Sequence, residues 1–234
     1  MKKGQRRIAL ALAGVAIILA MVALSFEGLF RIVDEKEIVG IQLPFGSGIT
    51  WHTEPGLKLR LFGKMIRYDK EFIFRIKNMD AGQVKIVAST YVNMPCDEAN
   101  LNKLAHQLGS QYLIQLKLLQ PAFDRVIFRS GLLVASIKSD ADRREQLKFF
   151  IEDQAAIGIY RTTARKEAIY DPATGEEKNV VIVEVISDPE NPNNYLRAEI
   201  SPLLDYGLKI HDLVIHELVL DKRKSTYFGN LKGY

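Results

Sequence analysis

The longest uninterrupted hydrophobic stretch lies at the start of the chain. Residues 8–26 read IALALAGVAIILAMVALSF and contain no charged residue and no proline. A helix of this length spans roughly 28 Å, close to the roughly 30 Å hydrocarbon thickness of a bilayer. The pattern therefore predicts a transmembrane anchor over residues 8–30. Its anchor residues include Ile8, Leu12, Ile17, Leu19 and Phe26.

A cleaved signal peptide is the competing interpretation of the same stretch. Ala23-Leu24-Ser25 offers a small-residue cleavage site, and cleavage would leave a processed, secreted α/β domain. However, the apolar run is longer than the ~7 to 15 residues of a signal h-region. Leu29 and Phe30 also continue the run beyond that site, so the anchor is favoured.

Between residues 31 and 95 the hydrophobic positions follow the two-residue period of β-strands. The segment 57–61, Leu-Lys-Leu-Arg-Leu, alternates strictly and follows a Pro55-Gly56 turn. Other short β-branched or aromatic runs occupy residues 38–43, 65–68, 71–76 and 84–92. These runs predict a β-rich first subdomain over residues 31–95.

After Pro95 the hydrophobic period becomes helical. Leu101, Leu104 and Leu108 fall on one helix face behind Asp97, which can cap the helix N-terminus. A second apolar helix is expected over about 111–128, with Pro121 as a break or kink, and a third from Ser139 with a capping box to Asp142. Strands at 160–170 and 180–186 suggest a hairpin insertion at about 161–188, and the last long strand is 208–220.

Together these elements predict an α+β fold with α/β character. The expected order is a tail over residues 1–7, a transmembrane helix, the β-rich subdomain, and a helix/strand subdomain over residues 96–220. Residues 221–234 follow as a C-terminal extension.

The positive charge of the chain sits almost entirely in its tail. Four of the 32 Lys and Arg residues lie in the first seven positions, which leaves 28 cations against 28 Asp and Glu. A nucleic-acid groove needs clustered cations on one face, so nucleic acid is an unfavoured partner. The positive-inside rule instead places the N-terminus in the cytoplasm. The expected localisation is a single-pass membrane protein whose main domain lies on the periplasmic or equivalent side.

No residue cluster in the sequence points to catalysis, a cofactor or a metal. His211 and His216 stand five apart, and on a strand an odd separation sends the two rings to opposite faces, so they are not expected to share a metal. Cys96 is the single cysteine and has no neighbouring histidine, so we expect a small residue at a turn rather than a nucleophile. The protein is expected not to be an enzyme, with no catalytic, cofactor or metal site.

Two apolar groups have a second interpretation besides the core. Leu57, Leu59, Leu61 and Phe62 form either core or a surface that enters the outer leaflet of a membrane. A helical stripe forms either core or a contact between subunits. That stripe contains Leu113, Leu116 and Ile127.

Several motifs in order resemble the stomatin/prohibitin/flotillin/HflK-HflC (SPFH) superfamily. They are EIVGIQLPFG at 37–46, EPGLK at 54–58, YDK at 68–70 and LDYGLKIHDLVI at 204–215, behind a basic, apolar N-terminus. In layout the chain is most similar to HflC and prohibitin. Members of that family continue into a long coiled coil after the last strand, whereas this chain ends at Tyr234, so it is either a short variant or a fragment.

The resemblance implies a two-part SPFH domain and a function as an oligomeric scaffold on a membrane. Its implied partners are the lipid bilayer, further copies of itself or a paralogous subunit, and a membrane protease of the FtsH-like AAA class. The alternative from another class is a membrane-tethered enzyme or ligand-binding domain, for which a deep polar pocket around Cys96 or His106 would be the sign.

Overall fold

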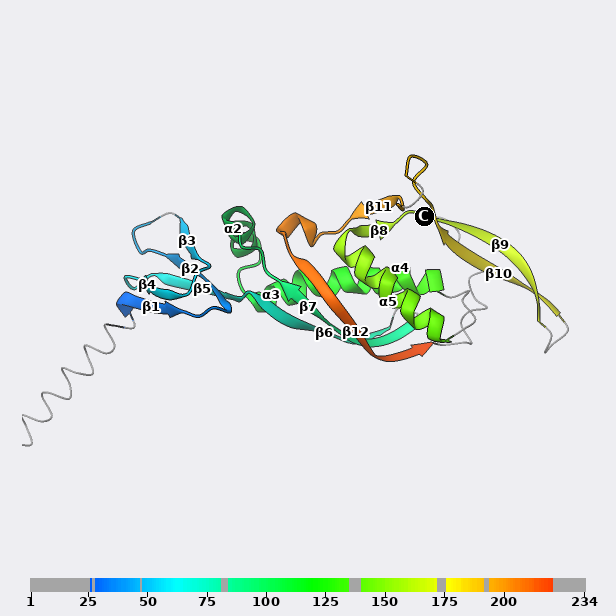
Figure 1. Cartoon of the computed structure of the whole chain (residues 1–234), viewed down its shortest axis with the longest axis horizontal. Helices are drawn as coiled ribbons and strands as arrows, with labels where there is room; N and C mark the ends of the chain where they lie inside the picture. The colour runs from blue at the N-terminus through cyan, green and yellow to red at the C-terminus, as the bar shows by residue number, and fades with distance from the viewer. Residues whose placement is uncertain are drawn as a thin grey trace, which may run out of the picture. The chain divides into compact units, whose positions relative to one another are not determined.

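The computed structural model describes residues 26, 28–46, 48–80, 84–134, 140–171, 176–191 and 194–220. The chain divides into two compact units, with the boundary between Lys70 and Glu71 (Figure 1). The sequence pattern placed a boundary after residue 95. The structure divides the chain earlier because the strands within residues 71–93 form one sheet with the strand at residues 209–220.

The described part of unit 1 consists mainly of short antiparallel strands. Strand β2 is the centre of a three-stranded sheet, and β1 and β4 form a separate two-stranded ribbon. The core between them contains Val33, Val39 and Ile41, with Met65 packed against it. The five strands are β1 (Phe30–Val33), β2 (Glu37–Gln42), β3 (Ile49–His52), β4 (Gly56–Leu59) and β5 (Lys64–Asp69).

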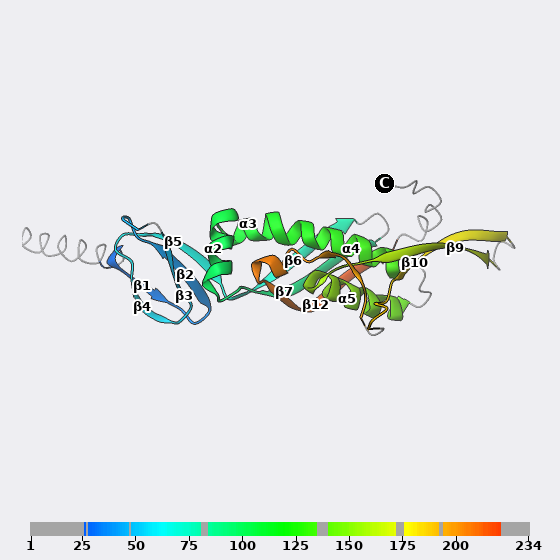
Figure 2. The same ribbon diagram turned by 90° about the horizontal axis from the view of Figure 1, so that it is seen from above.

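Unit 2 contains a three-stranded antiparallel sheet in the order β12-β7-β6, covered on one face by helices (Figures 1 and 2). The strands are β6 (Glu71–Asp80), β7 (Val84–Asn93) and β12 (Lys209–Leu220). The helices are α2 (Glu98–Gln107), α3 (Gln111–Ile114), the π-helical η1 (Gln115–Leu119), α4 (Gln120–Val134) and α5 (Asp140–Ala156).

Two smaller antiparallel pairs complete unit 2. Strand β8 (Gly158–Tyr160) pairs with β11 (Arg197–Ile200), and a 3-10 turn, η2 (Leu204–Tyr206), leads into β12. Strand β9 (Thr162–Asp171) pairs with β10 (Glu176–Val185) as a long hairpin. The antiparallel pairing of these strands agrees with the expected hairpin, whereas its interpretation as an insertion stays a prediction.

The core of unit 2 lies between the sheet and helices α4 and α5. Alternate residues of β6 are buried under α4, where the rings of Phe74 and Phe123 lie 5.5 Å apart. Full burial of large apolar side chains contributes about 1.5–3 kcal/mol each, so this layer is the main source of stability in unit 2. Other fully buried members are Ile76, Ile86, Leu119, Ile127 and Leu147.

Local sequence signals explain two of the helix boundaries. The carboxylate of Asp97 accepts the backbone N–H of Asn100 at 2.9 Å, which confirms the expected cap of α2 and lowers the pKa of Asp97. Pro121 lacks the N–H that would bond to Lys117. The helix accordingly widens into the π-helical turn η1 just before Pro121, so the expected break takes the form of a π turn rather than a sharp kink.

The fold class expected from the sequence is corrected in two respects. Within the described residues, no helix has the length and apolar character needed to cross a membrane. Every strand pair in the described residues is antiparallel, and strands are more abundant than helices. The expected α/β character is therefore also wrong, and the structure is a strand-rich α+β fold. The apolar run of residues 8–25 and the expected cap at Ser139 lie outside the described residues.

Candidate functional site

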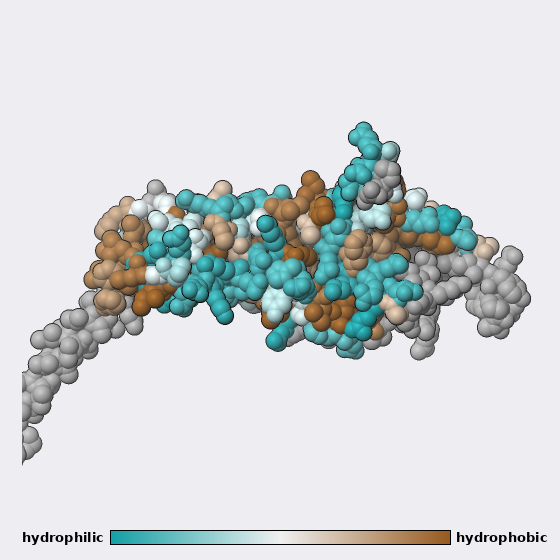
Figure 3. Space-filling view, viewed as in Figure 1, coloured by the Kyte–Doolittle hydropathy of each residue, from teal (hydrophilic) through white to brown (hydrophobic). Residues whose placement is uncertain are grey.

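The β1–β4 ribbon of unit 1 has one face made only of apolar side chains. In the antiparallel register Phe30 lies opposite Leu59 and Ile32 lies opposite Leu57, so these four share a face. Leu57 is 56% exposed, and Ile32 and Leu59 are exposed to a similar degree. We call this surface, together with the following Leu61 and Phe62, the apolar ribbon face. Figure 3 shows hydrophobic residues gathered over this part of unit 1.

The opposite face of the ribbon explains why these side chains point outward. Val33 on that face is buried in the core of unit 1. Arg31 on the same face forms an ion pair with Glu37, with a distance of 3.2 Å between Nη2 and Oε1. Because neighbouring residues of a strand point to opposite faces, burying Val33 and pairing Arg31 forces Phe30 and Ile32 outward.

A turn after β4 extends the apolar ribbon face. The backbone N–H of Phe62 donates to the carbonyl of Gly28 at 2.6 Å, and that of Arg60 donates to Leu29 at 2.7 Å. The Phe62 ring lies so close to Gly28 that a Cβ added there would be 2.3 Å from it, yet the ring remains 63% exposed. The backbone therefore fixes a large aromatic side chain at the surface.

The same turn holds two residues in a costly conformation. Leu61 has a φ of 46° and Phe62 a φ of 58°, in the left-handed region that side chains with a Cβ disfavour by roughly 1–2 kcal/mol each. Backbone hydrogen bonds from Leu61 to Leu29 and from Phe62 to Gly28 hold both residues in this conformation.

The chemistry of the apolar ribbon face suits a hydrocarbon environment. The charged neighbours Arg31 and Lys58 alternate with the apolar residues and lie on the opposite face of the ribbon. Placing one exposed leucine or phenylalanine in an apolar phase is favourable by up to about 1.5–3 kcal/mol, and the face has several of them. No side chain on this face needs a hydrogen-bond partner.

The structure places the residues expected from the sequence as follows. The core interpretation of Leu57, Leu59, Leu61 and Phe62 is wrong, because all four are exposed and lie together on one surface. Phe26 is 51% exposed and its ring lies 5.2 Å from that of Phe30. The other expected anchor residues, Ile8, Leu12, Ile17 and Leu19, lie outside the described residues.

The three expected subunit-contact residues do not share one surface. Ile127 in α4 is fully buried, at 0% exposure, so it belongs to the core. Leu116 in η1 is half exposed and Leu113 in α3 is intermediate. Only Leu116 of the three presents a large exposed surface.

The two histidines of β12 lie on the same face of the sheet, contrary to the sequence expectation. His211 stacks on Tyr91, with ring centroids 5.4 Å apart, and His216 lies 2.8 Å from the hydroxyl of Ser89. Ser89 and Tyr91 are two apart on β7 and therefore share a face. A β-bulge at Asp212, which has a φ of 53°, adds one residue to β12 and reverses the expected alternation.

These histidines have separate partners. The ring nitrogens of His211 lie 2.8 Å from an Asp212 carboxylate oxygen and 3.1 Å from a Glu71 carboxylate oxygen. These hydrogen bonds, first to Asp212 and then to Glu71, raise the pKa of His211 above its ordinary value of 6.5. Among the described residues no cluster of three or more His, Cys, Asp or Glu side chains could hold a metal ion.

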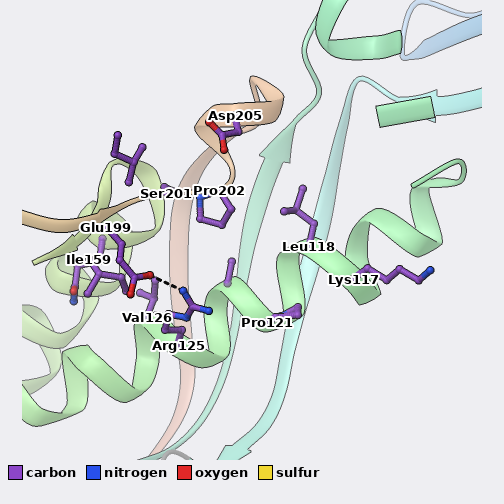
Figure 4. A pocket seen from close by; sticks show the side chains of 13 residues that line it. Lys117, Leu118, Pro121, Arg125, Val126, Ile159, Glu199, Ser201, Pro202 and Asp205 are labelled. Atoms are coloured by element: carbon purple, nitrogen blue, oxygen red, sulfur yellow. Dashed lines mark hydrogen bonds and ion pairs between the residues drawn. The ribbon is translucent and has the colours of Figure 1, made fainter. Parts of the chain in front are cut away.

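A pocket of about 270 Å³ in unit 2 is a second candidate (Figure 4). Its apolar lining includes Leu118, Val126 and Ile159, and at its rim Arg125 Nη1 lies 2.5 Å from Glu199 Oε2. The exposed cysteine Cys96 and His106 do not line this pocket. The pocket combines apolar residues with polar and charged ones, among them Gln154, Glu199 and Asp205.

Sequence reasoning missed half of the apolar ribbon face. Phe30 and Ile32 alternate with Arg31 and Val33, but a four-residue strand gives too short a pattern to assign its faces. The pairing of β1 with β4, two segments separated by more than twenty residues, is what brings the two halves together.

No protein-family model matches the chain, and no curated protein matches its sequence. The relation to the SPFH superfamily therefore stays a prediction from the motifs.

Proposed function

We propose that this protein is a membrane-apposed scaffold whose first unit inserts the apolar ribbon face into the interfacial layer of a bilayer. The observation that carries the proposal is an exposed, uncharged surface of aromatic and branched side chains, centred on Ile32, Leu57 and Phe62. Contiguous exposed apolar surfaces of this kind mark interaction sites with proteins or membranes.

Two further features favour a membrane over a protein as the occupant. The ribbon follows directly in the chain after an apolar, charge-free run with four cations before it, which is the sequence signature of a membrane-associated N-terminus. The four paired residues Phe30, Ile32, Leu57 and Leu59 also offer no side-chain hydrogen-bond donor or acceptor to a protein partner, whereas a lipid chain requires none.

The finer part of the proposal is an SPFH-type scaffold. It rests on the order of the motifs at 37–46, 54–58, 68–70 and 204–215. On this proposal the protein associates with itself or with a paralogue, with its main domain on the non-cytoplasmic side, and modulates a membrane-bound partner such as an AAA protease. The enzyme alternative gains no support from the described pockets, because neither Cys96 nor His106 lines them.

A depth measurement on the full chain tests membrane contact. Cys96 is the single cysteine, so Cys96→Ser gives a background into which Phe62→Cys can be introduced and labelled with the fluorophore NBD. In vesicles of phosphatidylethanolamine and phosphatidylglycerol we expect quenching by lipids that carry a spin label on the acyl chain, and little quenching by aqueous iodide.

Val214→Cys is the matched control, because Val214 is a half-exposed apolar residue on a strand of unit 2. We expect the label at position 214 to be quenched by iodide and not by the acyl-chain spin label. Equal iodide quenching at positions 62 and 214 would overturn the proposal.

A further inference from the structure

The three-stranded sheet of unit 2 has two edge strands, β12 and β6, and their outer edges differ in how they are covered. At the β12 edge, the backbone N–H of Leu213 donates to Glu152 Oε1 at 2.7 Å, and Arg144 donates to the carbonyl of Ile215. Both side chains come from α5, so this helix occupies the backbone groups that an added strand would need. Covering an edge in this way is how proteins prevent strand addition.

The β6 edge has no corresponding cover within the described part of the chain. Strand β6 is the last in the order β12-β7-β6, and no other described strand pairs with its outer edge. Phe72, Phe74 and Ile76 point into the core, whereas Glu71, Ile73 and Arg75 are exposed on the other face. An open edge with unpaired N–H and C=O groups is a template for another strand.

A groove runs beside this open edge. It has a volume of about 340 Å³ and lies between β6 and the α3–η1 segment. Tyr112 and Leu116 border the groove and are both largely exposed apolar residues on that segment. An added strand could therefore form backbone hydrogen bonds to β6 while apolar side chains beside it fill the groove, as in strand-addition complexes.

We propose that the occupant of this edge is β6 of a second copy, paired antiparallel about a two-fold axis that passes through Ile73. This register places Glu71 of each copy opposite Arg75 of the other, and Ile73 opposite Ile73. Two opposite-charge pairs then flank an apolar centre on the exposed face. The strand is self-complementary in charge, which is what an isologous contact requires.

The same geometry also places the helical layers together. A two-fold axis perpendicular to the sheet keeps α3 and η1 of both copies on the same side, so the two grooves face each other and the exposed Tyr112 and Leu116 side chains can fill them. The product is a continuous six-stranded sheet, a common size for a sheet in proteins. The six open residues, 71–76, give a contact length of roughly 20 Å.

This interface deepens the self-association in the proposed function, but it is independent of the membrane contact. It also uses the residue that the sequence pattern singled out for subunit contact and the structure left exposed, Leu116. Because an isologous contact closes on itself, it gives a discrete dimer rather than a filament.

A charge-swap series on the full chain in mild detergent tests the interface by sedimentation equilibrium. Glu71→Arg and Arg75→Glu each create two like-charge pairs across the two-fold, and we expect each variant to raise the dimer Kd by about tenfold or more. The double variant Glu71→Arg/Arg75→Glu restores both pairs, so we expect a Kd within about threefold of the original. Circular dichroism melting checks that each variant is folded.

A second pair of variants supports the test if a charge swap does not fold. Ile73 and Val214 are both 49% exposed on the same sheet, at its open and covered edge strands. We expect Ile73→Lys to dissociate the dimer because two lysines meet at the axis, and Val214→Lys to leave it intact.

A monomeric protein at micromolar concentration would overturn the proposal. So would an oligomer whose Kd is the same in the original protein, in the two single charge swaps and in Ile73→Lys. Failure of the double swap to restore the dimer would overturn the register. The membrane proposal fails on a different readout, the quenching of a label at position 62, so the two failures are distinguishable.

Discussion

The two exposed strand surfaces of this protein differ in how they combine apolar and polar side chains. On the apolar ribbon face of unit 1, the four paired side chains are all apolar, and no polar side chain lies among them on that face. They are Phe30, Ile32, Leu57 and Leu59. On the uncovered face of the unit 2 sheet, Ile73 and Val214 are exposed to a similar degree but lie beside charged or polar groups. Those groups are Glu71, Arg75, Ser89, His211 and His216.

The difference indicates two different environments. Charged and polar groups on the sheet face gain hydrogen bonds to water or to another protein, whereas in hydrocarbon they would cost several kcal/mol each. The apolar ribbon face has no such group to desolvate. This difference supports the proposal that the ribbon contacts lipid and that the sheet face contacts water or protein.

Charges placed on the ribbon are expected to have the largest effect on membrane contact. Leu57→Asp/Leu59→Asp removes two leucines that would otherwise enter lipid, worth about 3–6 kcal/mol together. We expect a fluorophore at position 62 to lose acyl-chain quenching in vesicles, while the stability in detergent changes by less than about 1 kcal/mol because both side chains are already exposed.

The matched pair Ile73→Asp/Val214→Asp places the same charges on the sheet face. We expect quenching at position 62 to be unchanged. Equal loss of quenching in both pairs would show that net charge, not the ribbon, controls membrane contact.

The next largest expected effect is on the stability of unit 1, through a glycine in the turn that follows the ribbon. A Cβ at Gly63 would lie 2.6 Å from the carbonyl oxygen of Gln42, whereas a Cβ at Gly48 would meet nothing within 4 Å. We expect Gly63→Ala to lower the free energy of unfolding of unit 1 by roughly 2 kcal/mol and Gly48→Ala to leave it nearly unchanged.

The single tryptophan provides the measurement for that prediction. Trp51 lies in β3 and stacks on Tyr68 at 5.7 Å, so its fluorescence during urea unfolding follows unit 1. Equal midpoints for the two alanine variants would contradict the tight fit at Gly63.

Relief of strain in the same turn has a smaller effect and the opposite sign. Leu61 adopts a left-handed φ that glycine accepts freely, although glycine also increases the entropy of the unfolded chain. We expect Leu61→Gly to raise the stability of unit 1 by about 0.5 kcal/mol and to weaken acyl-chain quenching at position 62. A loss of stability on the tryptophan readout would mean that Leu61 packs usefully in the folded state.

The smallest expected effect concerns the polar sheet face. The raised pKa of His211 means that its contacts with Asp212 and Glu71 stabilise the fold fully below the unfolded pKa of about 6.5 and lose that effect as pH rises through the higher folded value. We expect His211→Asn to reduce the melting temperature slightly at pH 6 and to have less effect at pH 9. NMR titration of the His211 ring checks the direction, and a folded pKa below 6.5 would contradict it.

Much of the strand pattern was predictable from the sequence, but the environment of each face was not. The alternation of Leu57, Leu59 and Leu61 with Lys58 and Arg60 predicts a strand with one apolar face, whichever phase covers that face. The assignment depends on β1, because Val33 takes the core position and turns Ile32 outward. That pairing is a long-range contact without a local signal.

In unit 2 as well, features that depend on local contacts were predictable from the sequence, and features that depend on strand register or packing were not. Asp97 was predictable as a cap because capping is local, and the structure confirms it. The bulge at Asp212 depends on the register between β12 and β7, so simple alternation placed His211 and His216 on opposite faces incorrectly. Ile127 was indistinguishable from an exposed stripe residue because α4 is apolar on more than one side.

Photocrosslinking at position 62 tests directly whether the apolar ribbon face enters the bilayer. Phe62 is replaced in the full chain by the photoreactive analogue benzoylphenylalanine, and Val214 is replaced in a second sample as the control. After illumination in native membranes, we expect mass spectrometry to find phospholipid adducts at position 62 and none at position 214. Adducts at position 62 formed only with protein, or no adduct with lipid at all, would contradict insertion of the apolar ribbon face into the bilayer.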